Sequence, residues 1–105
     1  MYGSERKPLI IALDVDGTYT EDIKMWDAVI KLIQSAGHKV VIVTMRYHGG
    51  EHGNIESREL IQIFEDVCPI YFTGRKAKKP FLDALGIVVD IWIDDRPEWI
   101  LQDSG

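Results

Sequence analysis

Two close pairs of aspartates occur in this chain of 105 residues, and each pair directly follows a run of apolar residues. Asp14 and Asp16 form the first pair, and Asp94 and Asp95 form the second. Carboxylates at the mouth of a buried strand are unfavourable unless they bind a cation or accept hydrogen bonds. Because like charges repel at such short range, a Mg²⁺ ion with oxygen ligands is the simplest neutralising partner. The two pairs therefore predict a magnesium site.

A hydroxyl and several basic groups lie near other predicted strand ends. Thr44 ends the apolar run that starts at Val40, and the basic segment Arg75–Lys79 precedes a predicted helix. Taken singly, each feature also has a plain structural interpretation: Asp-x-Asp-Gly as a turn, Thr44 as a backbone cap, and the basic segment as solvated surface. The segment after Asp14 is not a calcium-binding EF-hand loop, because Gly17 falls at position four instead of six. The combination, in this order and at strand ends, favours a functional site over coincidence.

Four apolar runs, separated by segments with helical periodicity, predict the elements that position these residues. The predicted strands are Leu9–Leu13, Val40–Val43, Ile70–Phe72 and Val88–Ile93. The predicted helices extend from about Ile23 to Gly37, from about Ile55 to Val67 and from about Pro80 to Gly86, and a last turn is predicted at Pro97–Gln102. Alternating strands and helices imply right-handed crossovers and a parallel sheet. We therefore expect an α/β fold of the Rossmann-like three-layer type with about four strands, which binds ligands at the carboxyl ends of its strands.

Length and composition limit the class of protein. The chain suffices for one domain over residues 1–105, with a polar N-terminal segment at residues 1–8. A net charge of −5 argues against broad binding to nucleic acid or to anionic membranes. Cys68 has no second cysteine to pair with, which excludes an intramolecular disulfide and a four-cysteine zinc site. No apolar run approaches the roughly 18 residues of a membrane span and no secretory signal is recognised, so we expect a cytoplasmic protein.

The motifs together resemble those of the haloacid dehalogenase superfamily of phosphotransferases. A strand followed by Asp-x-Asp-Gly-Thr matches at Ile10–Thr18, a strand that ends in Thr matches at Val40–Thr44, and an acidic pair after a strand matches at Ile91–Asp95. A lysine before or at a helix start completes the set, and Lys79 or Lys78 supplies it. The resemblance extends over nearly the whole chain and implies a Mg²⁺-dependent phosphatase that hydrolyses phosphomonoesters.

By this resemblance, Asp14 would be the nucleophile that attacks phosphorus and forms an aspartyl-phosphate intermediate. Asp16 would protonate the leaving alkoxide and then activate the hydrolytic water, while its main-chain carbonyl binds the metal. Asp14, Asp16 and Asp95 would be direct ligands of Mg²⁺. Asp94 would hold a metal-bound water or orient the lysine.

The other residues implied by the resemblance act on the phosphoryl group. Thr44 would donate its hydroxyl to a phosphoryl oxygen, and the lysine would neutralise the charge of the intermediate. Lys79 is the favoured lysine because it directly precedes a proline, and Lys78 is the alternative. Gly17, in the backbone that follows the nucleophile, would contact the substrate phosphate. Apart from the resemblance, Arg46 lies only two residues after Thr44, so it is either a substrate-binding residue or a solvated loop residue.

The segments after the first and second motifs are too short for the cap domain that most members of this family insert. A capless domain has an open active site, which suits a bulky or nucleotide-like phosphorylated substrate, or a lid borrowed from another subunit of a homo-oligomer. Trp92 and Trp99 either belong to the core or cover an exposed edge in such an oligomer. His48 and His52, in the loop after the second motif, are interpreted as solvated side chains.

Two other functions are compatible with these motifs. A signalling receiver accepts a phosphoryl group without turnover and also uses acidic residues, threonine and lysine on a parallel sheet. Its acidic pair follows the first strand, whereas the pair here follows the fourth predicted strand, so the phosphatase is the leading hypothesis. A catalytically inactive binding module of the same fold would retain the motifs but would neither bind Mg²⁺ productively nor turn over substrate.

Overall fold

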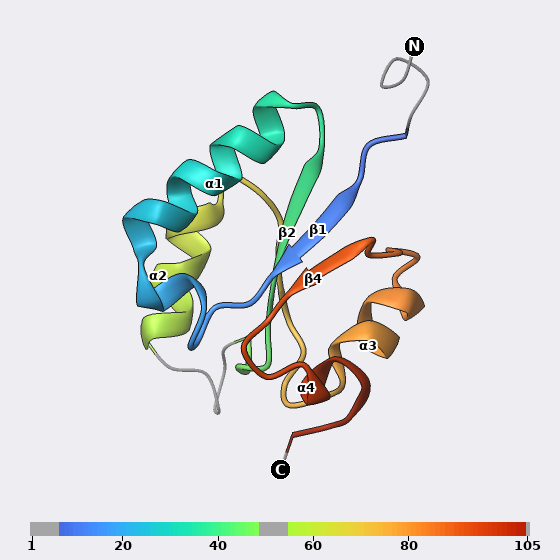
Figure 1. Ribbon diagram of the computed structural model, residues 1–105. Coiled ribbons are helices and arrows are strands. Elements are labelled where there is room, and N and C mark those ends of the chain that lie inside the picture. The colour runs from blue at the N-terminus through green and yellow to red at the C-terminus, as the bar shows by residue number, and fades with distance from the viewer. Residues whose placement is uncertain (1–6, 49–54, 105) are drawn as a thin grey trace.

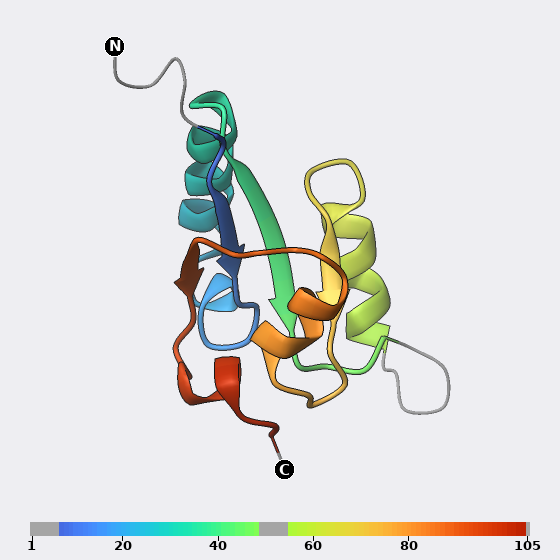
Figure 2. The same cartoon turned by 90° about the vertical axis from the view of Figure 1, so that its right-hand side faces the viewer.

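A sheet of four parallel strands forms the centre of the chain within the residues that the computed structural model describes, 7–48 and 55–104. The strands are β1 (Ile10–Leu13), β2 (Lys39–Thr44), β3 (Ile70–Phe72) and β4 (Ile91–Ile93), in the order β3-β2-β1-β4 (Figures 1 and 2). Leu13 of β1 pairs with Ile42 of β2 on one side and with Ile93 of β4 on the other. The carboxyl end of β1 therefore lies between those of β2 and β4.

Helices cover the sheet on both sides, which gives the expected Rossmann-like three-layer arrangement (Figure 1). The helices α1 (Ile23–Ser35) and α2 (Ile55–Phe64) lie on one side, and α3 (Lys78–Ala84) lies on the other, with the short helix α4 (Glu98–Leu101) packed beside it. A single 3-10 turn, η1 (Tyr19–Glu21), connects β1 to α1. Over the two described ranges, no helix has both the length and the apolar character that crossing a membrane requires.

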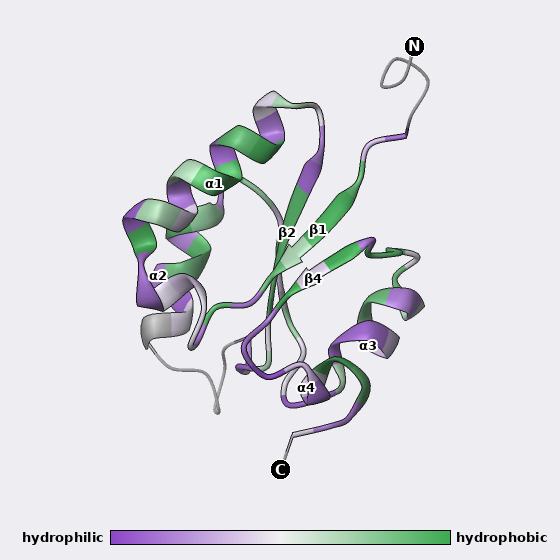
Figure 3. Cartoon of the chain, viewed as in Figure 1, coloured by the Kyte–Doolittle hydropathy of each residue, from purple (hydrophilic) through white to green (hydrophobic). Residues whose placement is uncertain are grey.

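The core consists of two apolar layers separated by the sheet. Along β2, Val40 and Ile42 belong to the layer under α1 and α2, whereas Val41 and Val43 belong to the layer under α3, where Leu82 is fully buried. Side chains of a strand point alternately to its two faces, so a continuous apolar run supplies both layers. Burial of each such side chain contributes roughly 1.5–3 kcal/mol. The strands are accordingly mostly hydrophobic in Figure 3, while the helices carry residues of both kinds.

The start of β4 and the end of α2 differ from the boundaries that the sequence predicts. The strand β4 begins at Ile91 and not at Val88, because the Asp90 carboxylate accepts the N–H of Ile10 at 2.8 Å, where a strand would offer a main-chain carbonyl. Val88 is consequently 66% exposed. Helix α2 ends at Phe64, whose carbonyl accepts two later N–H groups in a turn.

Helix α3 begins two residues earlier than its proline suggests, and this shift matters for the site. Ala77 has an extended backbone, and its N–H donates to Asp103 Oδ1 at 2.8 Å, so the helix begins with Lys78. Pro80 then occupies the first turn, where a missing N–H removes no intrahelical hydrogen bond. The one-residue offset between the two lysines places them differently: Lys78 is buried and Lys79 is exposed.

Candidate active site

Three aspartates meet at the carboxyl edge of the sheet. Asp14 follows β1, while Asp94 and Asp95 follow β4, and the parallel pairing of these two strands brings the groups together. One carboxylate oxygen from each residue lies within 4.8 Å of the others. A set of carboxylate oxygens is the type of ligand that Mg²⁺ and other hard cations prefer. The three residues therefore form a group that can hold a divalent cation, although acidic groups of this kind are not specific to one ion.

Lys78 connects two of these aspartates from the first turn of α3. Its Nζ donates to Asp14 Oδ1 at 2.7 Å and to Asp94 Oδ2 at 2.6 Å, and its side chain is only 2% exposed. Lys79 instead pairs with Asp83 on the outer surface of α3, at 2.8 Å. The preference for Lys79 is therefore wrong as to position, because the helix starts earlier and turns the first lysine toward the sheet. Asp94 accepts a hydrogen bond from this lysine, while a role in orienting it for catalysis stays a prediction.

Thr18 and Gly17 determine how closely the segment after β1 approaches Asp95, which follows β4. Thr18 Oγ1 donates to Asp14 Oδ2 at 3.2 Å and accepts the N–H of Asp95 at 3.2 Å. Gly17 has a φ of +83°, and a Cβ at this position would meet all three atoms of the Asp95 carboxyl group. The glycine is thus required for the close approach of Asp95, while a contact of Gly17 with substrate stays a prediction. Sequence analysis missed the role of Thr18; its hydroxyl, four residues after Asp14, was the available signal.

The acidic group carries more negative charge than Lys78 balances. Burial raises the pKa of Asp14 to about 7, although the charge of Lys78 and its hydrogen bond act in the opposite direction. Asp95 and Asp94 raise this pKa further, the first through a hydrogen bond and the second through its charge. Uptake of a cation would favour the ionised form of Asp14, so the electrostatics of the group fit a metal site.

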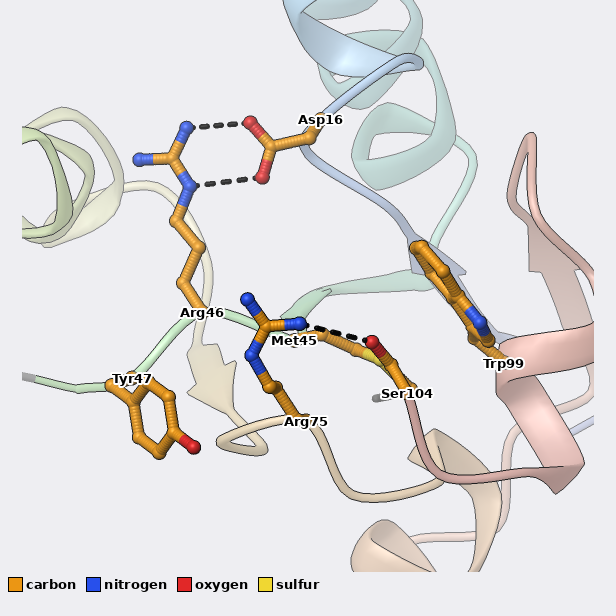
Figure 4. Close-up of a pocket in the computed structure, with 7 residues that line it drawn as sticks. All are labelled: Asp16, Met45, Arg46, Tyr47, Arg75, Trp99 and Ser104. Atoms are coloured by element: carbon orange, nitrogen blue, oxygen red, sulfur yellow. Dashed lines mark hydrogen bonds and ion pairs between the residues drawn. The ribbon is translucent and has the colours of Figure 1, made fainter. Parts of the chain in front are cut away.

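Asp16 does not belong to the three-aspartate group. Its carboxylate faces Arg46, whose Nε lies 2.9 Å from Oδ2 and whose Nη2 donates to Oδ1 (Figure 4). These hydrogen bonds from Arg46 lower the pKa of Asp16 below its usual range. The structure thus places Asp16 beside a predicted phosphate-binding residue, as an ionised acceptor and not as a proton donor.

Thr44 closes β2 next to the end of β1. Its side chain is buried, and its Oγ1 accepts the N–H of Arg46 at 3.3 Å, which helps to turn the following loop toward Asp16. In the same loop, the ring of His48 packs edge-on against Phe72 at a centroid distance of 5.2 Å, so this exposed histidine is not simply solvated. His52 lies outside the described residues.

A cavity of about 490 Å³ extends from the pair formed by Asp16 and Arg46 toward the C-terminal segment (Figure 4). Its other lining residues come from three parts of the chain: Met45 and Tyr47 after β2, Arg75 after β3, and Trp99 and Ser104 in and beyond α4. Of these five, Arg75 belongs to the basic segment that the sequence indicated, whereas Met45 and Ser104 were not expected at a site. Trp92, by contrast, packs against the apolar layer under α3 and belongs to the core.

Comparisons with known protein families, with curated proteins and with solved structures found no match for this chain. The class of the protein is therefore defined by its own geometry: an all-parallel α/β sheet with an acidic group and a buried lysine at its carboxyl edge. Any function has to be argued from the chemistry of these residues.

Proposed function

We propose that this chain is a Mg²⁺-dependent phosphomonoesterase of the haloacid dehalogenase type, which acts through an aspartyl-phosphate intermediate on Asp14. The observation that carries the proposal is the convergence of Asp14, Asp94 and Asp95 around buried Lys78 at the end of β1. Hydrolysis of a phosphate monoester is extremely slow without a catalyst, and it requires several preorganised charges around the phosphoryl group. The carboxyl edge of this sheet supplies such a group of charges.

In the proposed reaction, an Asp14 oxygen attacks phosphorus while the bond between phosphorus and the leaving oxygen breaks. Mg²⁺, held by Asp14, Asp95 and the main-chain carbonyl of Asp16, would supply charge neutralisation for the phosphoryl oxygens. Lys78 holds Asp14 in place through its hydrogen bond to Oδ1 and limits the build-up of negative charge. Thr44 donates its hydroxyl to a phosphoryl oxygen from the neighbouring strand end.

Asp16 then has two proton transfers to perform. It first gives a proton to the departing alkoxide, and afterwards it takes one from the water that attacks the phosphoenzyme, so the proton inventory balances over the cycle. In the structure Arg46 holds this carboxylate in its ionised form. A phosphoryl group that binds Arg46 competes with Asp16 for the guanidinium, because both are anions that accept two parallel hydrogen bonds. The negative charge of the bound phosphate raises the pKa of the freed Asp16, which then takes up from solvent the proton that it gives to the leaving alkoxide.

The test is release of inorganic phosphate from p-nitrophenyl phosphate in the presence of Mg²⁺. We expect turnover by the native chain and none above background for Asp14→Asn, which is close in shape but cannot act as nucleophile. Asp83→Asn is the matched control, because this exposed aspartate pairs with Lys79 away from the site, and it should retain full activity. Full activity of Asp14→Asn contradicts the proposal.

Two further outcomes discriminate between the phosphatase and its alternatives. Stable phosphorylation of Asp14 by acetyl phosphate, without release of phosphate over minutes, identifies a receiver. A folded chain that fails to bind Mg²⁺ at millimolar concentration by calorimetry identifies an inactive binding module. Either result replaces the phosphatase proposal.

A further inference from the structure

The backbone of Arg75 is held in an uncommon conformation next to the cavity. Its φ is 69°, a region that residues other than glycine rarely adopt. The N–H of Arg75 donates to the carbonyl of Met45 at 2.8 Å, and its own carbonyl accepts the N–H of Ser104 at 2.8 Å. The loop after β2 and the C-terminal segment thus fix this residue from both sides. Such positions are retained where the surrounding structure over-determines them, which is frequent at ligand-binding sites.

The side chain of Arg75 lines the cavity on a different side from Arg46 (Figure 4). Its guanidinium donates to Oγ of buried Ser104 at 3.3 Å and forms no ion pair with any described residue. Arg46, in contrast, already faces the carboxylate of Asp16. The cavity therefore presents two guanidinium groups and one carboxylate, in a chain whose net charge is −5.

Trp99 adds an aromatic wall to this basic cavity. The residue is half-buried in α4 and contributes to the lining together with Tyr47. Planar aromatic side chains next to arginine are the combination by which proteins bind a nucleobase and its phosphate. A volume of about 490 Å³ lies within the range of pockets that enclose a molecule of nucleotide size.

We propose that Arg75 binds a second phosphate of the substrate, so that the enzyme selects nucleotides that carry two phosphates. This inference rests on the proposed function: one phosphate is hydrolysed at Asp14, the other contacts Arg75, and the base lies against Trp99. The second phosphate belongs either to a free nucleoside bisphosphate or to the phosphodiester next to a strand end. The chemistry that Arg75 recognises is the same in both cases.

Binding is measured by calorimetry in the Asp14→Asn variant, so that the test does not require turnover. The probes are adenosine 3′,5′-bisphosphate and adenosine 5′-monophosphate. We expect the chain to bind the bisphosphate about tenfold more tightly, and Arg75→Gln to abolish this preference. Arg75→Lys keeps the charge and should retain most of the preference, which excludes a general effect of substitution at this position. Lys76→Gln removes an adjacent exposed charge and should change nothing.

The outcomes separate this inference from the proposed function. If hydrolysis is absent but Arg75→Gln still abolishes the preference for the bisphosphate, the cavity is assigned correctly and the phosphatase is not. If hydrolysis occurs and Arg75→Gln leaves the preference unchanged, the assignment of Arg75 is wrong. A short oligonucleotide with a terminal phosphate distinguishes the two sources: tighter binding than the bisphosphate indicates a strand end, and equal or weaker binding indicates a free nucleotide.

Discussion

Removal of the Lys78 charge is the most direct test of how the acidic group is stabilised. The variant Lys78→Met keeps an unbranched side chain of similar length and deletes the ammonium group. Nζ of Lys78 bonds Asp14 at 2.7 Å and Asp94 at 2.6 Å, and these two carboxylates are 9% and 2% exposed. The substitution therefore leaves two nearly buried carboxylates without their cation.

The magnitude follows from the burial of these partners. Breaking a buried ion pair by removal of one side costs about 3–5 kcal/mol, because the other charge stays desolvated. Lys79→Met is the matched control, since the neighbouring lysine forms an exposed pair with Asp83 one helical turn away, and such pairs contribute about 0.3–0.5 kcal/mol. A domain of this size is stable by only about 5–15 kcal/mol, so the first variant loses a large part of its stability and the second does not.

The assay is urea denaturation followed by circular dichroism, at pH 8 and with a chelator present. This pH lies above the pKa of about 7 that Asp14 has in the native chain. Lys78 lowers that pKa, so its removal raises the pKa further, and proton uptake by Asp14 keeps the loss toward the lower end of the expected range. Saturating Mg²⁺ should restore part of the stability of Lys78→Met, because the ion neutralises the same carboxylates. A difference below about 1 kcal/mol between the two variants would refute the argument from burial.

Two further predictions concern the backbone of the site and the titration of the core. Gly17→Ala should weaken Mg²⁺ binding in calorimetry and unfold at a lower urea concentration, because the added Cβ displaces the Asp95 carboxylate. Gly37→Ala is the control, because it carries the same backbone strain at φ +89° but its Cβ meets no atom within 4 Å. This control should lose stability without a change in Mg²⁺ affinity. Burial raises the pKa of Cys68 from 9.0 to about 11, so its neutral thiol stabilises the fold fully below pH 9, and this contribution is lost as the pH rises to about 11. The urea midpoint of the native chain should therefore fall more steeply over this range than that of Cys68→Ala, and parallel curves would contradict the assignment.

Most of the fold is encoded in short-range patterns, which explains why it can be predicted from the sequence. The run from Val40 to Val43 has no polar member, so it is typical of a strand that is covered on both faces. The apolar layers on the two faces of β2 confirm this prediction. The ends of elements are less predictable because distant groups determine them. The side chain of Asp90 replaces part of the ladder beside Ile10, and no local pattern indicates that contact.

The candidate site likewise has features that the local sequence determines and features that only the tertiary structure determines. The sequence by itself determines which groups stand at strand ends, since the acidic pairs, Thr44 and the basic segment are local features of parallel α/β chains. Only the tertiary structure decides which of them meet. The pairing of β1 with β4 brings Asp14 to Asp94, and the start of α3 selects Lys78 over its neighbour.

Contacts between distant loops are decided by the tertiary structure alone. Arg46 and Asp16 are 30 residues apart, and Arg75 reaches Ser104 across 29 residues. Their meeting therefore depends on how three loops and the C-terminal segment fold over one edge of the sheet. Strand order and helix starts are set by the packing of the whole core, in which each side chain responds to many neighbours at once. For this reason the sequence specifies the chemical groups of the site, and the fold specifies their partners.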